Sequence, residues 1–233
     1  MHFIELFDRV EIINLVKRKD RKSQVLEQLM RLGYSVDKKK IHLFEAIQPE
    51  TNGEFPSIGA RGCFESHLNI LKKAEKDGVR NLLIIEDDLN FSDEIGDLSC
   101  DFYTLLDNND WSFAYLAHHY DTGEGVPPRG LVRLRETDLI KCTHLIGISG
   151  TILTDLVKYL EKMKMRNGGD PLGGPMHVDG AYNWYRKDSH CGTVIAVPPL
   201  GYQRSSRSDI ADVKFYDRLP ILRSIINYLR KFK

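Results

Sequence analysis

The sequence predicts an α/β protein with a mostly parallel central sheet flanked by helices. Segments typical of strands alternate with segments typical of amphipathic helices, and the short connections between them favour parallel strands joined by helical crossovers. One predicted strand, residues 82–85, is continuously apolar, as expected for a strand buried on both faces. A chain of 233 residues is long enough to build one hydrophobic core of this kind.

The first half of the chain is expected to contain three strands, two helices and a loop. The first helix has apolar residues at helical spacing and ends at Gly33, while the second places Leu68, Leu71 and Ala74 on one side. Glycines mark the loop. In order, these segments are strand 10–16, helix 20–32, strand 41–46, loop 52–62, helix 64–77 and strand 82–85.

The second half continues the alternation of strands and helices. Its predicted segments are strand 111–116, a turn-rich loop 123–130, strand 142–148, helix 150–164, helix 180–186 and strand 194–198. We assign residues 1–215 to one domain and residues 216–233 to a C-terminal helix.

Composition argues against several classes of protein. Formal net charge is zero, whereas a nucleic-acid-binding domain carries an excess of Lys and Arg, so we expect no nucleic-acid partner. The four cysteines are dispersed without a Cys-x-x-Cys pair, which fits neither a zinc cluster nor a disulfide framework and favours a reducing compartment. Without a signal-peptide pattern or a membrane-length apolar run, the sequence predicts a cytoplasmic protein.

Three consecutive carboxylates follow the buried strand 82–85. Glu86, Asp87 and Asp88 therefore fall at its carboxyl end, where open α/β sheets bind ligands. Crowded carboxylate oxygens suit Mg²⁺ or Mn²⁺, ions that are commonly shared with the phosphates of a nucleotide. The alternative is a solvated turn after the strand.

Two other segments carry candidate ligand-binding residues. At the end of the first strand, Asn14, Arg18 and Arg21 would hold a base, ribose or phosphate, while Asp20 caps the helix that follows. The alternative for the basic residues is a solvated face. The glycine loop before the second helix offers Arg61, Ser66 and His67 close together in the chain. The alternative there is an ordinary turn with His67 as a helix residue of no special role.

These motifs, in this order and spacing, resemble glycosyltransferase family 25. This family includes lipopolysaccharide-biosynthesis galactosyltransferases and collagen-modifying galactosyltransferases. The resemblance extends over residues 10–210. It rests on Asn14-Leu with Arg18 and Asp20-Arg21, on Gly62-Cys-Phe-Glu-Ser-His67 and on Ile84-Ile-Glu-Asp-Asp88, with further likeness in residues 110–116 and 143–149.

The resemblance implies a metal-dependent nucleotide-sugar transferase with a GT-A-like fold. By analogy, Glu86 and Asp88 face the metal and the diphosphate, with Asp87 nearby, and Arg18, Arg21 and residues 59–67 line the donor site. A later segment, residues 200–210, resembles a Gln- and Ser-rich family motif, in which Gln203 and Arg207 would bind the diphosphate. The alternative for this segment is a solvated linker. The reaction that the resemblance implies moves a hexose, galactose from UDP-galactose, with inversion, onto a lipopolysaccharide or another cell-surface glycan.

An inverting transfer also needs a base for the acceptor hydroxyl. We select Asp179 because aromatic residues that stack on sugars surround it in the sequence, although it would equally serve as the cap of helix 180–186. His177 is our candidate for a further metal ligand, in competition with His118, His119 and His190.

Residues 218–233 form a basic amphipathic pattern. Such a helix suits peripheral contact with the inner face of a membrane, where a lipid-linked saccharide acceptor would be found. Docking of the helix on its own domain is the alternative.

Two other functions compete with a transferase. A non-catalytic saccharide- or nucleotide-binding module would share the transferase fold without turnover. A phospho-acceptor receiver domain would explain the acidic motif but needs a phosphorylatable Asp after a later strand, and residues 131–134 supply none.

Overall fold

The computed structural model describes residues 3–37, 39–108, 110–120 and 129–204. A seven-stranded sheet forms its centre, with the strand order β2-β1-β3-β7-β5-β8-β6. Its strands are β1 (Arg9–Asn14), β2 (Ile41–Glu45), β3 (Asn81–Glu86), β5 (Phe113–His119), β6 (Gly130–Leu134), β7 (Lys141–Ser149) and β8 (Thr193–Val197). The short strands β4 (Leu89–Phe91) and β9 (Gly201–Gln203) form a separate antiparallel pair.

Most strands of the central sheet run in one direction. Parallel pairs join β1 to β2, β1 to β3 and β5 to β8, whereas β7 is antiparallel to both β3 and β5 and β6 is antiparallel to β8. The carboxyl ends of β1, β2 and β3 therefore meet at one edge. Because β7 runs the other way, its amino-terminal residues lie at this same edge, beside the end of β3.

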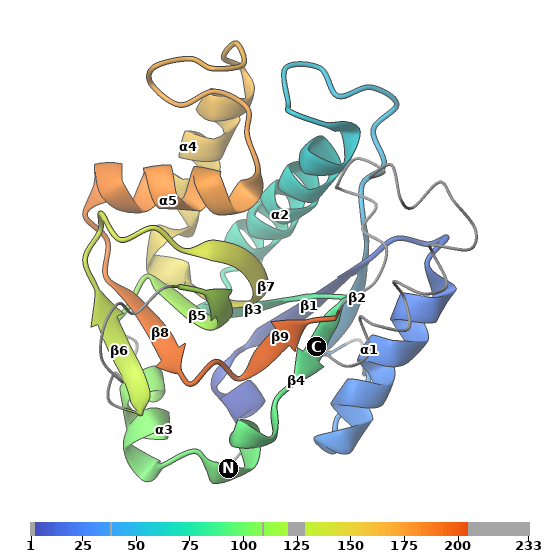
Figure 1. Cartoon of the computed structure of the whole chain (residues 1–233), viewed down its shortest axis with the longest axis vertical. Helices are drawn as coiled ribbons and strands as arrows, with labels where there is room; N and C mark the ends of the chain where they lie inside the picture. Colours follow the sequence, from blue (N-terminus) through green and yellow to red (C-terminus); the bar gives the residue numbers. More distant parts are fainter. Residues whose placement is uncertain (1–2, 38, 109, 121–128, 205–233) are drawn as a thin grey trace, which may run out of the picture.

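Helices cover both faces of the sheet (Figure 1). On one face lie α2 (Ile58–Lys76), α4 (Leu153–Lys164) and α5 (Val178–Ser189). On the other face lie α1 (Lys19–Arg31), α3 (Cys100–Asp107) and the 3₁₀ helix η1 (Phe3–Leu6). Two further 3₁₀ helices are η2 (Asp93–Asp97) and η3 (Gly150–Ile152).

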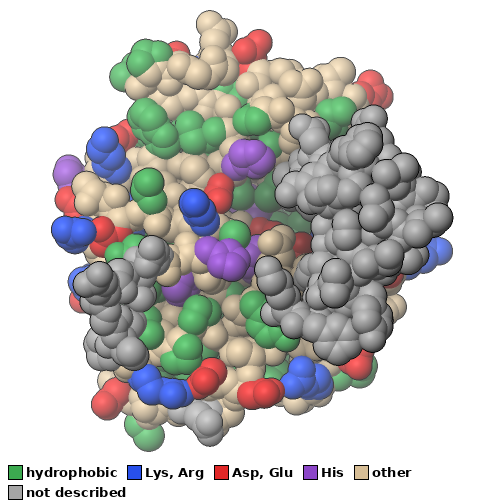
Figure 2. Space-filling model, in the orientation of Figure 1, with side chains coloured by type: hydrophobic (Ala, Val, Ile, Leu, Met, Phe, Trp, Pro, Cys, Tyr) green, Lys and Arg blue, Asp and Glu red, His purple; other side chains and the backbone are tan. Residues whose placement is uncertain are grey.

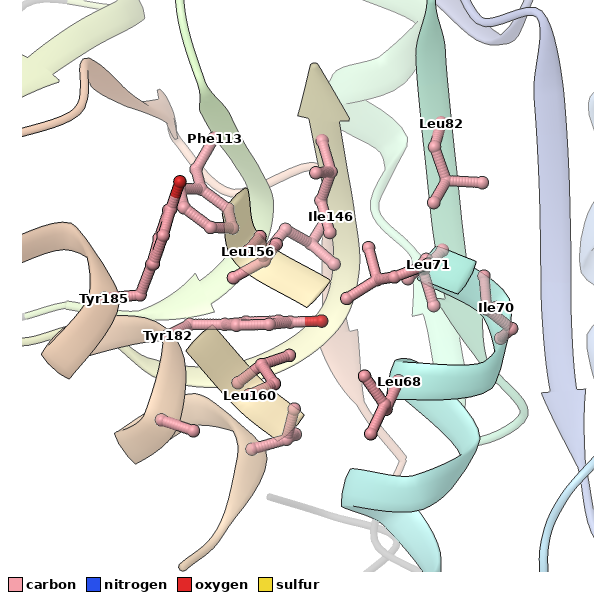
Figure 3. Close-up of a cluster of buried hydrophobic side chains, with 14 of the residues drawn as sticks. Leu68, Ile70, Leu71, Leu82, Phe113, Ile146, Leu156, Leu160, Tyr182 and Tyr185 are labelled. Carbon is pink, nitrogen blue, oxygen red and sulfur yellow. The ribbon is translucent and has the colours of Figure 1, made fainter. Parts of the chain in front are cut away.

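The core on the α2, α4 and α5 side is a continuous apolar layer. Figure 3 shows Leu71 of α2 and Leu156 of α4 directed toward Ile146 of β7, with Phe113 and Tyr182 beside them. All five side chains are buried completely. Burial of this area is the main favourable contribution to folding, and it fixes the three helices on this face of the sheet, next to the edge that carries the carboxylates.

The predicted strands 10–16, 41–46, 82–85, 111–116, 142–148 and 194–198 are all present, with small differences at their ends. One prediction was wrong in a way that matters for the site: α2 begins at Ile58, so the glycine motif lies within a helix and not in a loop. Ser57 caps this helix, its Oγ accepting a hydrogen bond from the backbone N–H of Ala60 at 3.0 Å. Because Gly59 and Gly62 have low helix propensity, the sequence did not indicate that this first turn is helical.

Candidate active site

The three carboxylates lie at the carboxyl end of β3, as the apolar run predicted. Asp87 and Asp88 are only 6% and 5% exposed, and Glu86 is partly buried. The parallel pairing of β1 with β3 brings Asn14, the last residue of β1, to the same place. A solvated turn, the alternative reading of these residues, is therefore wrong for Asp87 and Asp88.

Asp87 is held by two residues that the sequence singled out. Asn14 Nδ2 donates a hydrogen bond to Asp87 Oδ2 at 2.6 Å, and Arg21 Nη1 donates one to Asp87 Oδ1 at 3.1 Å. The same Arg21 nitrogen lies 3.1 Å from Asp88 Oδ2. Burial raises the pKa of Asp87, and Arg21 and Asn14 offset part of that rise. Arg21 thus provides one positive charge that is shared by two buried carboxylates.

A second group of side chains combines Glu86, Asp88 and His144, whose ligand atoms lie within 4.8 Å of one another. His144 Nδ1 stands 3.6 Å from Glu86 Oε2 and 3.8 Å from Asp88 Oδ1. Thr143 Oγ1 donates a 2.5 Å hydrogen bond to Glu86 Oε1, and Gln203 Nε2 donates one to Asp88 Oδ2 at 3.2 Å. The remaining oxygen, Asp88 Oδ1, is buried and has no hydrogen-bond partner among the described residues.

This group favours a positive charge. Burial alone would lower the pKa of His144, but the adjacent Cys142 and Glu86 raise it to about 10. Burial raises the pKa of Asp88, and the charge of Glu86 raises it further. Two carboxylate oxygens, one of them unpaired, and an imidazole form a donor set that fits a divalent cation such as Mn²⁺ or Mg²⁺.

Glu86 also faces α2 and α5. His67 of α2 is completely buried, with Nε2 at 3.8 Å from Glu86 Oε1, and its Nδ1 shares a 3.0 Å hydrogen bond with the hydroxyl of Tyr182 in α5. Burial lowers the pKa of His67 to about 4, although Glu86 and Asp179 act in the opposite direction. His67 is therefore neutral at pH 7 and serves as a polar link between the two helices and the carboxylates.

A cavity of about 270 Å³ opens beside the carboxylates. It lies between the segments that follow β1 and β2, the first turns of α2 and the end of β3, and Figure 2 shows acidic side chains in a hollow of this face, next to histidines. The N-terminus of α2 adds backbone N–H groups and a partial positive charge, which suit an anionic ligand. The lining residues are Ile13, Leu15, Lys17, Arg21, Ala46, Ile47, Gln48, Pro49, Ile58, Gly59, Gly62, Cys63, Ser66, Glu86, Asp87 and Asp88.

One wall of the cavity depends on a glycine. A Cβ atom on Gly62 would lie 2.6 Å from the carbonyl oxygen of Ile47 and 3.3 Å from Pro49 Cδ, so α2 and the segment after β2 touch only because this side chain is absent. We expect Gly62→Ala to lower the free energy of unfolding by about 1–3 kcal/mol, since a backbone carbonyl must move. Urea unfolding measures this loss.

The matched control for Gly62→Ala is Gly96→Ala. A Cβ atom on Gly96 meets nothing within 4 Å, so its free energy of unfolding should stay within about 0.5 kcal/mol of the parent value. If the two variants unfolded at the same urea concentration, the contact between Gly62 and Ile47 would have no importance for stability.

Three of the predicted donor-binding residues are engaged in local contacts. Arg18 occupies the N-cap position of α1 and pairs with Asp20 at 2.9 Å, so Asp20 lies in the first turn and is not the N-cap residue that we expected. Arg61 pairs with Glu65 at 3.0 Å on the same helix. Ser66 Oγ accepts a hydrogen bond from Ile47 N–H at 2.8 Å and donates one to Gly62 C=O at 2.7 Å. Their role toward a ligand stays a prediction.

Asp179 lies in the first turn of α5 and is partly exposed. Its Oδ1 accepts a hydrogen bond from Gly180 N–H at 2.8 Å, and its Oδ2 accepts one from Cys142 N–H at 3.2 Å, which ties α5 to β7. The N-cap position belongs to His177, which is exposed and is a member of none of the metal-ligand groups found among the described residues. The structure thus offers His144 where the sequence suggested His177.

The remaining histidine candidates differ in environment. His118 is buried, with Nε2 at 3.0 Å from the carbonyl oxygen of Ala196, and His190 is exposed beside Glu136.

Three of the predictions concern segments outside the described residues: Arg207, the helix 218–233 and most of the loop 123–130. Within the described part of the chain, no helix has the length and apolar character needed to cross a membrane.

Sequence reasoning missed His144 and Thr143 as members of the site. Both lie in the segment 143–149 that supported the family resemblance. That resemblance could have indicated a role in the site, but the segment was interpreted only as a strand. Their position follows from the antiparallel direction of β7, which places its beginning next to Glu86.

Comparison with known families gives one match that spans half of the chain. The family described as glycosyltransferase family 25 (LPS biosynthesis protein) matches residues 7–124. Procollagen galactosyltransferase 2 of Mus musculus is 25% identical over 201 residues, covering 74% of this chain and 29% of that protein. Procollagen galactosyltransferase 1 of Danio rerio is 31% identical over 101 residues, covering 36% of this chain and 17% of that protein. The chain therefore spans less than a third of either relative.

Among solved structures, a glycosyltransferase involved in the glycosylation of the major capsid of PBCV-1 superimposes with a TM-score of 0.53. The match covers 97% of this chain and 100% of that one at 12% identity, so it shows the fold alone. The predicted α/β, GT-A-like fold is confirmed.

Proposed function

The chain belongs to glycosyltransferase family 25, and we propose that it transfers a hexose from a nucleotide-sugar donor to a hydroxyl of a saccharide acceptor. The observation that carries this proposal is the cavity beside Glu86, Asp87 and Asp88. It joins an apolar pocket to a cluster of ionisable groups, which is the combination that a nucleoside diphosphate requires. UDP-galactose is our proposed donor, because two relatives are named galactosyltransferases.

The nucleoside part of the donor fits the wall formed after β1 and β2. Leu15, Ala46 and Pro49 give an apolar surface for a base, and Gln48 offers an amide for its polar edge. The diphosphate would then lie toward the first turns of α2 and the carboxylates. Arg21 would support the carboxylates there, and Gln203 would hold Asp88 in position.

Glu86 and Asp88, with His144 beside them, are the residues that would hold Mn²⁺ or Mg²⁺. Such an ion, when bound, neutralises charge on the diphosphate and so makes it a better leaving group. Arg21 supplies a fixed positive charge at 3.1 Å from Asp88, which limits the repulsion among the carboxylates. Thr143 fixes one oxygen of Glu86 and leaves the other directed toward His144.

Asp179 is our proposed base for the acceptor hydroxyl in an inverting transfer. Its Oδ2 accepts a hydrogen bond from the backbone of Cys142, and the next residue, Thr143, donates one to Glu86, so the carboxylate is close to the proposed donor site. Both oxygens accept backbone hydrogen bonds, which orient the carboxylate and leave it further lone pairs for a hydroxyl proton. A lipopolysaccharide or another cell-surface glycan, including a lipid-linked one, is the proposed acceptor class.

Calorimetric titration of UDP tests the donor site. We expect heat of binding with Mn²⁺ present and none after chelation, because the carboxylates repel a diphosphate that arrives without a cation. An affinity for UDP that is the same with Mn²⁺ and after chelation would contradict the assignment of Glu86 and Asp88 as metal ligands.

Turnover separates an enzyme from a non-catalytic nucleotide-binding module, the competing proposal. Release of UDP from UDP-galactose, measured with and without a saccharide acceptor, is expected only from the enzyme. Metal-dependent UDP binding without any turnover over a panel of donors and acceptors would favour the module.

A further inference from the structure

A second group of potential metal ligands lies next to the carboxylates. His119 ends β5, and Cys142 and His144 belong to the neighbouring strand β7. One ligand atom from each residue lies within 4.8 Å of the other two. The rings of His119 and His144 are nearly perpendicular, at 87°, with their centroids 6.2 Å apart. Histidines also gather on this face of the molecule in Figure 2.

The backbone is irregular at these residues. The pairing of β5 with β7 shifts in register between Tyr115 and Ala117 and again between Ala117 and His119. Cys142 has a φ of 72°, in the left-handed region that a residue with a Cβ rarely adopts. Bulges and strained backbone of this kind are found preferentially beside functional sites, where they redirect side chains.

His144 supplies an independent indication of a ligand. It is only 3% exposed, and neither ring nitrogen makes a hydrogen bond to a described residue, although Nδ1 lies 3.6 Å from Glu86 Oε2 and 3.8 Å from Asp88 Oδ1. The two carboxylates favour positive charge at this buried imidazole, and a coordinated cation would supply that charge and the partner that the ring nitrogens lack. The cysteine at this point is a free thiol, partly accessible from the surface.

We propose that His119, Cys142 and His144 bind a borderline-soft divalent cation, of which Zn²⁺ is the natural example. Thiolate sulfur and imidazole nitrogen are the ligands that Zn²⁺ prefers, and three protein ligands leave one tetrahedral position open. Glu86 and Asp88 provide hard oxygen ligands that suit Mg²⁺ or Mn²⁺ instead. The two groups share His144 but differ in chemistry, so this site does not depend on the proposed transferase activity.

Co²⁺ is the probe for this site, because a cobalt ion bound to a thiolate shows a ligand-to-metal charge-transfer band and tetrahedral coordination gives strong visible bands. Titration of the reduced full chain with Co²⁺ is expected to produce both, and Zn²⁺ is expected to remove them by displacement. Cys142→Ser should lose the charge-transfer band. His119→Ala, at an exposed position that does not threaten the fold, should weaken Co²⁺ binding by at least about tenfold.

The matched control is Cys63→Ser, because Cys63 forms a different candidate group with His67 and Glu86. This variant should keep the charge-transfer band. Asp88→Asn should also keep it, which would separate the thiolate site from the carboxylate site. The proposal is overturned if the parent chain shows no charge-transfer band, if the band survives Cys142→Ser, or if Cys63→Ser removes it.

Discussion

Asp88→Asn is expected to abolish metal-dependent UDP binding and to lower kcat by about 100- to 1000-fold while the fold is retained. The substitution keeps the shape of the side chain and the oxygen that accepts from Gln203. It removes the negative charge that, together with Glu86, would attract the cation. Retention of the fold is expected because the change also relieves repulsion among three crowded carboxylates.

The matched control for Asp88→Asn is Asp93→Asn. The side chain of Asp93 is completely exposed and pairs only on the surface with Arg31, so this variant makes the same change in net charge away from the cavity. Calorimetry with UDP and Mn²⁺ should give the parent affinity for Asp93→Asn and no binding for Asp88→Asn. If both variants bound UDP with the affinity of the parent, the assignment of Asp88 as a metal ligand would be wrong.

The position of the carboxylates was predictable because it follows from two local signals. An apolar run long enough for a buried strand ends at Ile85, and three acidic residues come next. The same reasoning placed Asn14 and Arg21 at this end of the sheet, but as residues that would hold a base, ribose or phosphate. Their hydrogen bonds to Asp87 were not predicted. The apolar pattern of a strand and the charges that follow it are local features, so they can be recognised in a single sequence.

The contribution of β7 was not predictable in this way. A strand reads alike in both directions, so the segment 142–148 gave no sign that it runs antiparallel and brings its first residues to the edge with Glu86. For this reason His144 was not among the histidines considered as ligands, and His177 was selected. The dispersed cysteines likewise argued against zinc, because spacing along the chain does not reveal that Cys142 lies close to two histidines in space.

The fold also depends on a buried arginine that carries no recognisable motif. Arg186 of α5 is completely buried, and its guanidinium lies 5.9 Å from the ring centre of Tyr115. It donates four hydrogen bonds of 2.8–3.0 Å, to Thr193 Oγ1, Asn183 Oδ1 and the carbonyl oxygens of Asp138 and Arg135. The planar, fork-like guanidinium satisfies acceptors from β8, α5 and the segment between β6 and β7 together.

Arg186→Ala is expected to lower the free energy of unfolding by about 3–5 kcal/mol, since it opens a cavity and leaves these acceptors without donors. Equilibrium urea unfolding measures the loss. Arg80→Ala is the control: this side chain is 84% exposed and pairs with Asp8, so its removal should cost no more than about 1 kcal/mol.

The effect of Arg186→Ala should extend to the site because α5 also carries Asp179 and Tyr182. A loosened α5 weakens the hydrogen bond between Tyr182 and His67, and with it the alignment of Asp179 toward β7. Arg186→Lys would keep the charge but lose the fork, so its stability should fall between those of the parent and Arg186→Ala. A loss below about 1 kcal/mol in Arg186→Ala would mean that water replaces the guanidinium and that α5 is held by its apolar face alone.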